Sequence, residues 1–257
     1  MPGIGVLRGL VSADLADLAD LADRASGVGG PTGWPGPGRE DRAVREDRLA
    51  ATRASYDAVA HDYAELLRDH LDGQPTDRGV LARFAGSIVA EGGGLVGDLG
   101  CGPGRLFGAL GSLGLEVVGV DLSPAMVAVA RDEHPAVAAT VGSLDRLPLP
   151  TGALAGALLW HSTIHTPDDD LPAVFAEVRR AVRPGGLVVA AFQVGDEVRH
   201  HRHLYGHDLD LRSHRRSPDA VADSARVGGW VEDDRIVRGP AGGEDGEQAY
   251  LFLRSTR

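Results

Sequence analysis

The stretch that decides the fold is VGDLGCGPGR, Val96 to Arg105, in which three glycines follow a short apolar run that ends in an acid. Glycine lets a backbone adopt strained angles and approach a ligand closely. The dinucleotide fingerprint is G-x-G-x-x-G. Here Gly100, Gly102 and Gly104 are spaced G-x-G-x-G, and an arginine stands where the dinucleotide loop has its third glycine. The loop therefore favours a ligand other than a dinucleotide.

Two acids near the loop narrow the ligand further. Asp98 lies two residues before the first glycine, where a carboxylate is awkward beside a pyrophosphate but suits a cationic amino group. Asp121 follows at about the 20-residue separation at which an acid can bind ribose hydroxyls. Together these features describe a ligand with a ribose and an ammonium group and no phosphate, which fits S-adenosylmethionine.

Outward from the loop, apolar runs alternate with helical segments, a pattern typical of a parallel sheet with helices on both faces. Expected strands cover residues 94–100, 116–122, 136–142, 152–160, 186–194, 231–239 and 247–255. Expected helices cover residues 105–114, 123–134, 168–186 and 217–230. We therefore predict an α/β fold that is Rossmann-like and doubly wound, with a mostly parallel seven-stranded sheet, an antiparallel edge strand and an N-terminal helical cap.

Three motifs, DLGCGPGR, VVGVDLSPAMVAVAR and VRRAVRPGGLVVAAF, occur in an order and spacing that resemble the class I S-adenosylmethionine-dependent methyltransferases. The type 11 group, which acts on small molecules, is the most similar. The resemblance extends from about residue 56 to residue 192. It implies transfer of a methyl group from S-adenosylmethionine to a small-molecule acceptor by direct displacement.

Composition and the resemblance together indicate a domain organisation. Residues 1–44 carry a three-residue repeat and then a stretch dense in glycine and proline, so we expect a disordered leader, with a partner-binding helix as the alternative. We expect residues 45–257 to form one class I methyltransferase domain. Within it, residues 45–92 would be the helical cap and residues 193–216 a lid, although a solvated polar loop is an open alternative for that segment.

The resemblance assigns a set of residues to the cofactor: Tyr56, Tyr63, Asp98, Gly100, Cys101, Gly102, Gly104, Asp121, Leu122, Met126, Ser143, Leu144 and His161. Ser143 departs from the pattern, because the family often carries an acid there that recognises the adenine amine. The backbone amide of Leu144 would take over part of that recognition. Cys101 is also the type of residue that fills a small buried space.

The loop after residues 152–160 and the polar segment 200–214 supply the candidates for catalysis and acceptor binding. His165 and His161 are the candidate catalytic residues, because histidine titrates near neutrality. Trp160, Tyr205 and His207 are candidate substrate contacts. The five histidines between residues 200 and 214 match no zinc-ligand spacing, so no metal site is expected.

Composition limits the other function classes. The 257 residues carry a formal net charge of −11, and no basic stripe suited to nucleic acid is present. No apolar run reaches the ~20 residues of a membrane span, and a single cysteine fits a cytoplasmic protein. Oligomeric state stays open. Two alternatives remain: a nicotinamide-dependent oxidoreductase, disfavoured because the chain lacks lysine for a Tyr/Lys relay, and a non-catalytic S-adenosylmethionine-binding protein.

Overall fold

The structure is a computed structural model that describes residues 39–241 and 244–255. Most of the expected leader lies outside these residues. The first described helix, α2 (Arg39–Leu67), already includes residues 39–44 and continues unbroken for 29 residues. The cap is therefore one long helix followed by the 3₁₀ turn η3 (His70–Gly73) and α3 (Pro75–Ala90).

Seven strands of the described chain form one sheet in the order β3-β2-β1-β4-β5-β9-β8. Their bounds are β1 (Leu95–Leu99), β2 (Glu116–Asp121), β3 (Ala138–Val141), β4 (Leu154–Trp160), β5 (Val182–Gln193), β8 (Trp230–Arg238) and β9 (Gln248–Ser255). The first five strands pair in parallel. β9 is antiparallel to both β5 and β8, so the reversed strand lies next to the edge strand.

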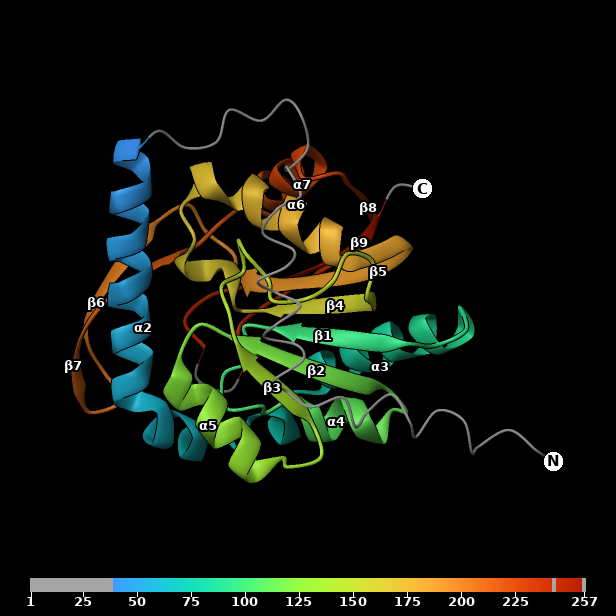
Figure 1. Ribbon diagram of the computed structural model, residues 1–257, viewed down its shortest axis with the longest axis horizontal. Coiled ribbons are helices and arrows are strands. Elements are labelled where there is room, and N and C mark those ends of the chain that lie inside the picture. Colours follow the sequence, from blue (N-terminus) through green and yellow to red (C-terminus); the bar gives the residue numbers. More distant parts are fainter. Residues whose placement is uncertain (1–38, 242–243, 256–257) are drawn as a thin grey trace.

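Helices cover both faces of this sheet, as Figure 1 shows. On one face lie α3, α4 (Phe107–Ser112) and α5 (Pro124–Glu133), and on the other lie α6 (Leu171–Ala181) and α7 (Pro218–Val227). β4 is buried at every position, which is why its sequence is a continuous apolar run rather than an alternating one. The predicted doubly wound fold is confirmed.

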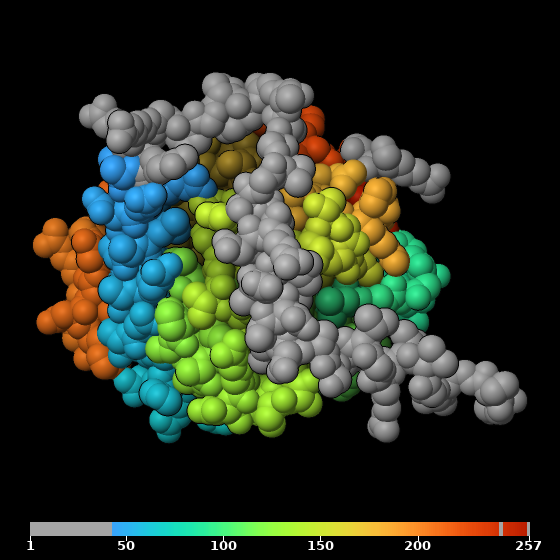
Figure 2. Space-filling model, in the orientation of Figure 1, coloured from blue at the N-terminus to red at the C-terminus, as the bar shows by residue number. Residues whose placement is uncertain are grey.

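The segment expected to be a polar loop or lid folds differently. It contains a two-stranded antiparallel hairpin, β6 (Val198–Leu204) and β7 (His207–His214), that forms a sheet of its own. The expectation of a polar loop is therefore wrong, whereas the lid stays a prediction. β7 packs against α2, and Figure 2 shows the helix and the hairpin side by side at one end of the molecule.

The sheet topology fixes where a ligand can bind. β1 lies between β2 and β4, so the chain direction around the sheet reverses there. Ligands of open α/β sheets bind beyond the carboxyl ends of the strands at this switch point. Among the described helices, none has the length and apolar character of a membrane span.

Candidate active site

The loop after β1 is shaped by its glycines. Gly100 has φ +81°, and a Cβ built there would lie 2.2 Å from the Cβ of Ser162, in the loop after β4. Gly102 has φ +55°, and its Cβ would meet only the ring of Tyr63, at 3.9 Å. The first glycine therefore lets two loops pack together. The second leaves open the space that a ligand would need.

Asp121, at the end of β2, holds this loop in place. Its carboxylate accepts hydrogen bonds from the backbone N–H groups of Gly102 and Ser123, each at 2.8 Å. Burial raises its pKa, while these two backbone donors act in the opposite direction. Because each oxygen has one donor, lone pairs remain for ligand hydroxyls.

Asp98, at the end of β1, is the buried acid of the site. Its side chain is 1% exposed, and neither carboxylate oxygen has a hydrogen-bond partner. Burial raises its pKa to about 7, with a smaller increase from Asp121 that is opposed by the Arg105 guanidinium. Buried carboxylates without partners are rare, because each oxygen loses its water without compensation. This position calls for a cationic hydrogen-bond donor.

The loop after β4 carries further unpartnered polar atoms. The indole Nε1 of Trp160, the Nδ1 of His161 and the hydroxyl of Ser162 are buried without hydrogen bonds. His161 has φ +56°, a left-handed conformation that is strained in residues other than glycine. Burial lowers the pKa of His161 to about 3, so its ring is neutral. Strain and unsatisfied groups together mark this loop as part of a functional site.

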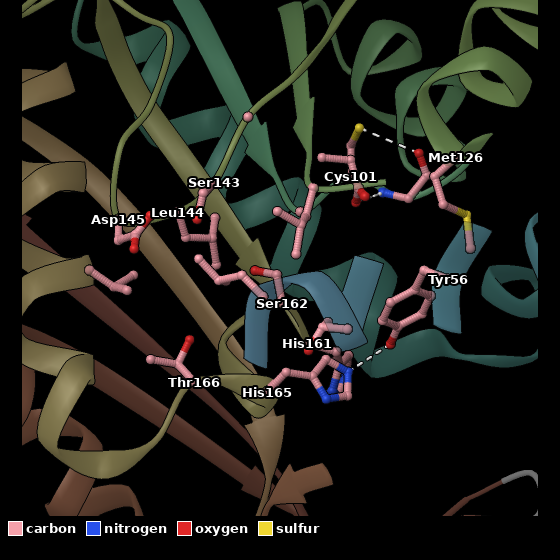
Figure 3. A pocket seen from close by; sticks show the side chains of 18 of the residues that line it. Tyr56, Cys101, Met126, Ser143, Leu144, Asp145, His161, Ser162, His165 and Thr166 are labelled. Carbon is pink, nitrogen blue, oxygen red and sulfur yellow. Dashed lines mark hydrogen bonds between the residues drawn. The ribbon is translucent and has the colours of Figure 1, made fainter. Parts of the chain in front are cut away.

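These loops and α2 enclose a cavity, part of which Figure 3 shows. Lining residues from the candidate cofactor set are Tyr56, Tyr63, Gly100, Cys101, Gly102, Asp121, Leu122, Met126, Ser143, Leu144 and His161. Trp160 and His165 line it as well. Two members of the set do not line the cavity: Asp98 lies buried near the end of β1, and a Cβ at Gly104 would lie 2.7 Å from the ring of Phe107.

Sequence reasoning missed the part of α2 that closes this cavity. Its lining residues are Arg45, Arg48, Leu49 and Thr52, in addition to the two tyrosines. Arg45 forms an ion pair with Asp145 after β3, and Arg48 forms one with Asp170 before α6. The signal was present, since positions 45, 48, 49, 52, 56 and 63 follow the spacing of one helix face.

Tyr56 and His165 point toward each other across the cavity (Figure 3). The Nδ1–H of His165 donates to the backbone carbonyl of Arg212 at 2.5 Å, so its Nε2 accepts from the Tyr56 hydroxyl at 2.7 Å. Burial lowers the pKa of His165 to about 4 and raises that of Tyr56. Both side chains are therefore neutral near pH 7, and a proton path leads from the tyrosine oxygen to the imidazole.

The three candidate substrate contacts lie in different places. Trp160 lines the cavity described above. Tyr205, at the tip of the hairpin, packs its ring edge-on against Tyr63 with centroids 5.2 Å apart and lines a second, adjoining cavity. His207 lines neither cavity and pairs with Asp62 of α2 at 2.6 Å.

Comparison with known proteins agrees with this geometry. Residues 96–186 match the family profile of the methyltransferase domain. The malonyl-[acyl-carrier protein] O-methyltransferase of Serratia marcescens is 30% identical over 132 residues, 51% of each chain. An uncharacterized methyltransferase of Mycobacterium tuberculosis is 33% identical over 120 residues, 44% of this chain and 47% of that protein. The chain thus spans about half the length of the curated relatives it matches.

Solved structures share the fold. The 1,6-didemethyltoxoflavin-N1-methyltransferase of Burkholderia thailandensis, with bound 1,6-didemethyltoxoflavin and S-adenosylhomocysteine, has a TM-score of 0.62 at 18% identity. The alignment covers 90% of this chain and 94% of that one. The magnesium protoporphyrin IX methyltransferase of Synechocystis has a TM-score of 0.61 at 15% identity, with 82% and 98% covered. The glycine loop, the strand order and the profile match agree: residues 96–186 form a methyltransferase domain, and the solved methyltransferase structures share the fold of the chain.

Proposed function

We propose that this chain transfers a methyl group from S-adenosylmethionine to a small-molecule acceptor by direct displacement. The observation that carries the proposal is the Asp98 carboxylate, buried with both oxygens unpartnered beside a glycine loop that Asp121 holds in place. The cofactor carries an ammonium group, which would donate hydrogen bonds to the unpartnered Asp98 carboxylate. It also carries ribose hydroxyls, which would donate hydrogen bonds to Asp121. The names of the relatives, one acting on a malonyl carrier and one on a small heterocycle, support a small acceptor.

Each part of the site would hold one part of the cofactor. Asp98, His161 and the backbone of the glycine loop would hold the methionine portion. Leu122 and Met126 supply an apolar slot for the adenine; the methionine is fully buried and suits a planar ring. The neighbouring residues Ser143 and Leu144 would recognise the edge of that ring, and Tyr56 and Tyr63 would cover it.

The cofactor supplies an electrophilic methyl group on a positively charged sulfur, and the chain must orient the acceptor and exclude water. Correct orientation alone supplies up to about 7–11 kcal/mol of barrier reduction. The α2 helix, tied down through Arg45 and Arg48, provides a cover that excludes solvent from the cavity. Exclusion of water strengthens the electrostatic contacts beneath it.

The Tyr56–His165 pair would receive the acceptor's proton. Held by Asp98, Asp121 and the glycine loop, the cofactor would supply its methyl group to the acceptor oxygen or nitrogen, and the electron pair of the broken carbon–sulfur bond would stay on sulfur. The acceptor proton moves to the Tyr56 oxygen, and the tyrosine proton moves to Nε2 of His165. A histidine with a pKa of about 4 is a weak base. It suffices here because the acceptor proton becomes strongly acidic as methylation proceeds.

Calorimetry tests the proposal directly. The purified chain should bind S-adenosylhomocysteine and should not bind NADH. Incubation with methyl-labelled S-adenosylmethionine and a library of small hydroxyl and N–H compounds should then label a product. Binding of NADH in place of S-adenosylhomocysteine would overturn the cofactor assignment. Cofactor binding without labelled product across the library would favour a non-catalytic binding protein.

A further inference from the structure

The β6–β7 hairpin and the Tyr56–His165 pair enclose a second cavity of about 190 Å³. Its lining residues are Tyr56, Ile164, His165, Gln193, Arg199, His201, Leu204, Tyr205, Leu211, Ser213, Arg215 and Asp245. Tyr56 and His165 line the cofactor cavity as well, so the two cavities meet at these two rings. Whatever occupies the second cavity therefore meets the proton path.

The hairpin presents one face to this cavity by strand alternation. Arg199 pairs with Ser213, and His201 pairs with Leu211, so their side chains lie on the same face. The intervening residues His200 and Asp210 face solvent, where they pair with each other. The hairpin residues thus divide between an inner and an outer face, and its histidines do not form one cluster.

A bulge moves this alternation by one residue. The pairing register shifts between His201 and His203, so Leu204 lines the cavity while His203 pairs with the exposed Asp208. The turn that follows holds Tyr205 at φ +56°, a strained conformation for a residue with a side chain. Bulges and strained residues next to a cavity redirect side chains at a cost in stability, and they are enriched at functional sites.

The charged groups that line the cavity are two guanidiniums, Arg199 and Arg215, and one carboxylate, Asp245, so its lining is net cationic. The Arg215 side chain is 8% exposed, whereas its partners Asp245 and Glu197 are 61% and 51% exposed. Arg199 shares the same two carboxylates. Because water screens the exposed carboxylates more than it screens the buried guanidinium, the interior of the cavity favours an anionic group. Guanidinium groups bind carboxylates in a planar, two-point geometry.

Size and the remaining lining define the body of the occupant. An apolar cavity of about 150 Å³ in another protein holds a benzene ring, so about 190 Å³ holds one substituted ring. The apolar side chains of Ile164, Leu204 and Leu211, with the Tyr205 ring, suit such a body.

From these observations we infer that the second cavity is the acceptor site and takes a single-ring aromatic carboxylate, with its carboxylate on Arg215 and a hydroxyl or N–H group at Tyr56. This inference rests on the proposed methyl transfer, since it supplies the acceptor for that reaction. It also gives the hairpin a role as the wall that selects the acceptor.

A matched pair of probes tests the inference. 4-Hydroxybenzoate and 4-hydroxybenzamide differ mainly in charge, and both are titrated into the protein saturated with S-adenosylhomocysteine. A hydrogen bond to a charged group predicts that the carboxylate binds at least about tenfold more tightly than the amide. Arg215→Gln should abolish this preference. Arg202→Gln, an exposed arginine on the same hairpin, should preserve it.

The controls separate the two proposals. S-adenosylhomocysteine affinity within twofold of the wild type shows that a variant still has an intact cofactor cavity. Leu211→Trp fills the second cavity from β7. It should block the binding of both probes and leave the affinity for S-adenosylhomocysteine unchanged. This variant replaces Arg215→Gln in the test if Arg215→Gln does not fold. Equal binding of the two probes to the wild type, or an unchanged preference in Arg215→Gln, overturns the acceptor site. Failure of the wild type to bind S-adenosylhomocysteine overturns the proposed function instead.

Discussion

Replacing Asp98 with asparagine should stabilise the cofactor-free protein while weakening its binding of cofactor. Burial raises the pKa of Asp98 from 3.8 to about 7. A carboxyl group whose pKa is raised in the folded state keeps a proton that the unfolded chain has already released, so its contribution to stability is lost as pH rises from about 4 to about 7. At about 1.36 kcal/mol per pKa unit, the charged group costs about 4 kcal/mol at pH 8.5. Asparagine has the same shape and no charge.

Urea denaturation without cofactor measures this cost. Asp98→Asn should exceed the wild type in unfolding free energy by about 2 kcal/mol at pH 5 and about 4 kcal/mol at pH 8.5. The buried histidines titrate in the opposite sense, but they are common to both proteins and cancel in the difference. Asp132→Asn, a change at an exposed acid of α5, is the matched control and should show no such growth with pH.

The same substitution should lower the affinity for S-adenosylhomocysteine at least about tenfold, because a charge-assisted hydrogen bond is lost. Below pH 7, binding to the wild type should release a proton from Asp98, seen as a calorimetric enthalpy that differs between phosphate and imidazole buffers. The variant should show no such dependence. A variant no more stable than the wild type at pH 8.5, with unchanged cofactor affinity, would refute the reasoning.

Three further changes test other parts of the site. Asp121→Ala should weaken S-adenosylhomocysteine binding at least about tenfold in calorimetry, through loss of the ribose contact and of the support for the glycine loop; unchanged affinity would count against the ribose assignment. His165→Gln should lower kcat by about 10²-fold with little change in cofactor affinity. The kcat of the wild type should fall only as pH drops toward 4, because the pKa of this histidine is about 4. A fall in kcat centred near pH 6.5 would contradict the buried, neutral ring. Gly100→Ala should destabilise the protein and abolish cofactor binding, since the new Cβ would lie 2.2 Å from a side-chain carbon of the facing loop. Gly108→Ala, in open space on α4, is the control and should raise the urea midpoint slightly. Similar behaviour of the two variants would show that the facing loop moves to accept the new Cβ.

The central sheet was predictable because its strands are apolar runs bounded by glycines and acids. Expected segments 94–100, 116–122 and 152–160 contain the observed strands β1, β2 and β4 within one or two residues. β5 starts at Val182, four residues before its expected start, because the chain passes directly from α6 into the strand. The Pro-Gly-Gly sequence, which is typical of a turn, forms an irregularity within β5: the register with β4 shifts there, and Gly185 has φ +79°.

The hairpin was not predictable for two physical reasons. Except for Leu211 and Ser213, the residues of its two strands are exposed or half-buried, so no apolar run marks them. The bulge opposite Arg202 also interrupts the alternation that would otherwise identify a strand. Long-range partners were also invisible in the sequence. Nothing near His207 indicates Asp62 as its partner, and nothing near His165 indicates the carbonyl of Arg212. Such contacts follow only from the packing of the hairpin on α2.

The one-residue bulge in the hairpin has a consequence for how this protein diversifies. Arg202 of β6 faces two residues of β7, Leu209 and Asp210, so deleting one of these two would restore a regular ladder and turn His203, in place of Leu204, to the face that carries His201. The cofactor loops, carried on β1, β2 and β4, would be untouched by that edit. A short insertion or deletion in this ribbon can therefore change which molecules are methylated in one mutational event, while the source of the methyl group stays the same.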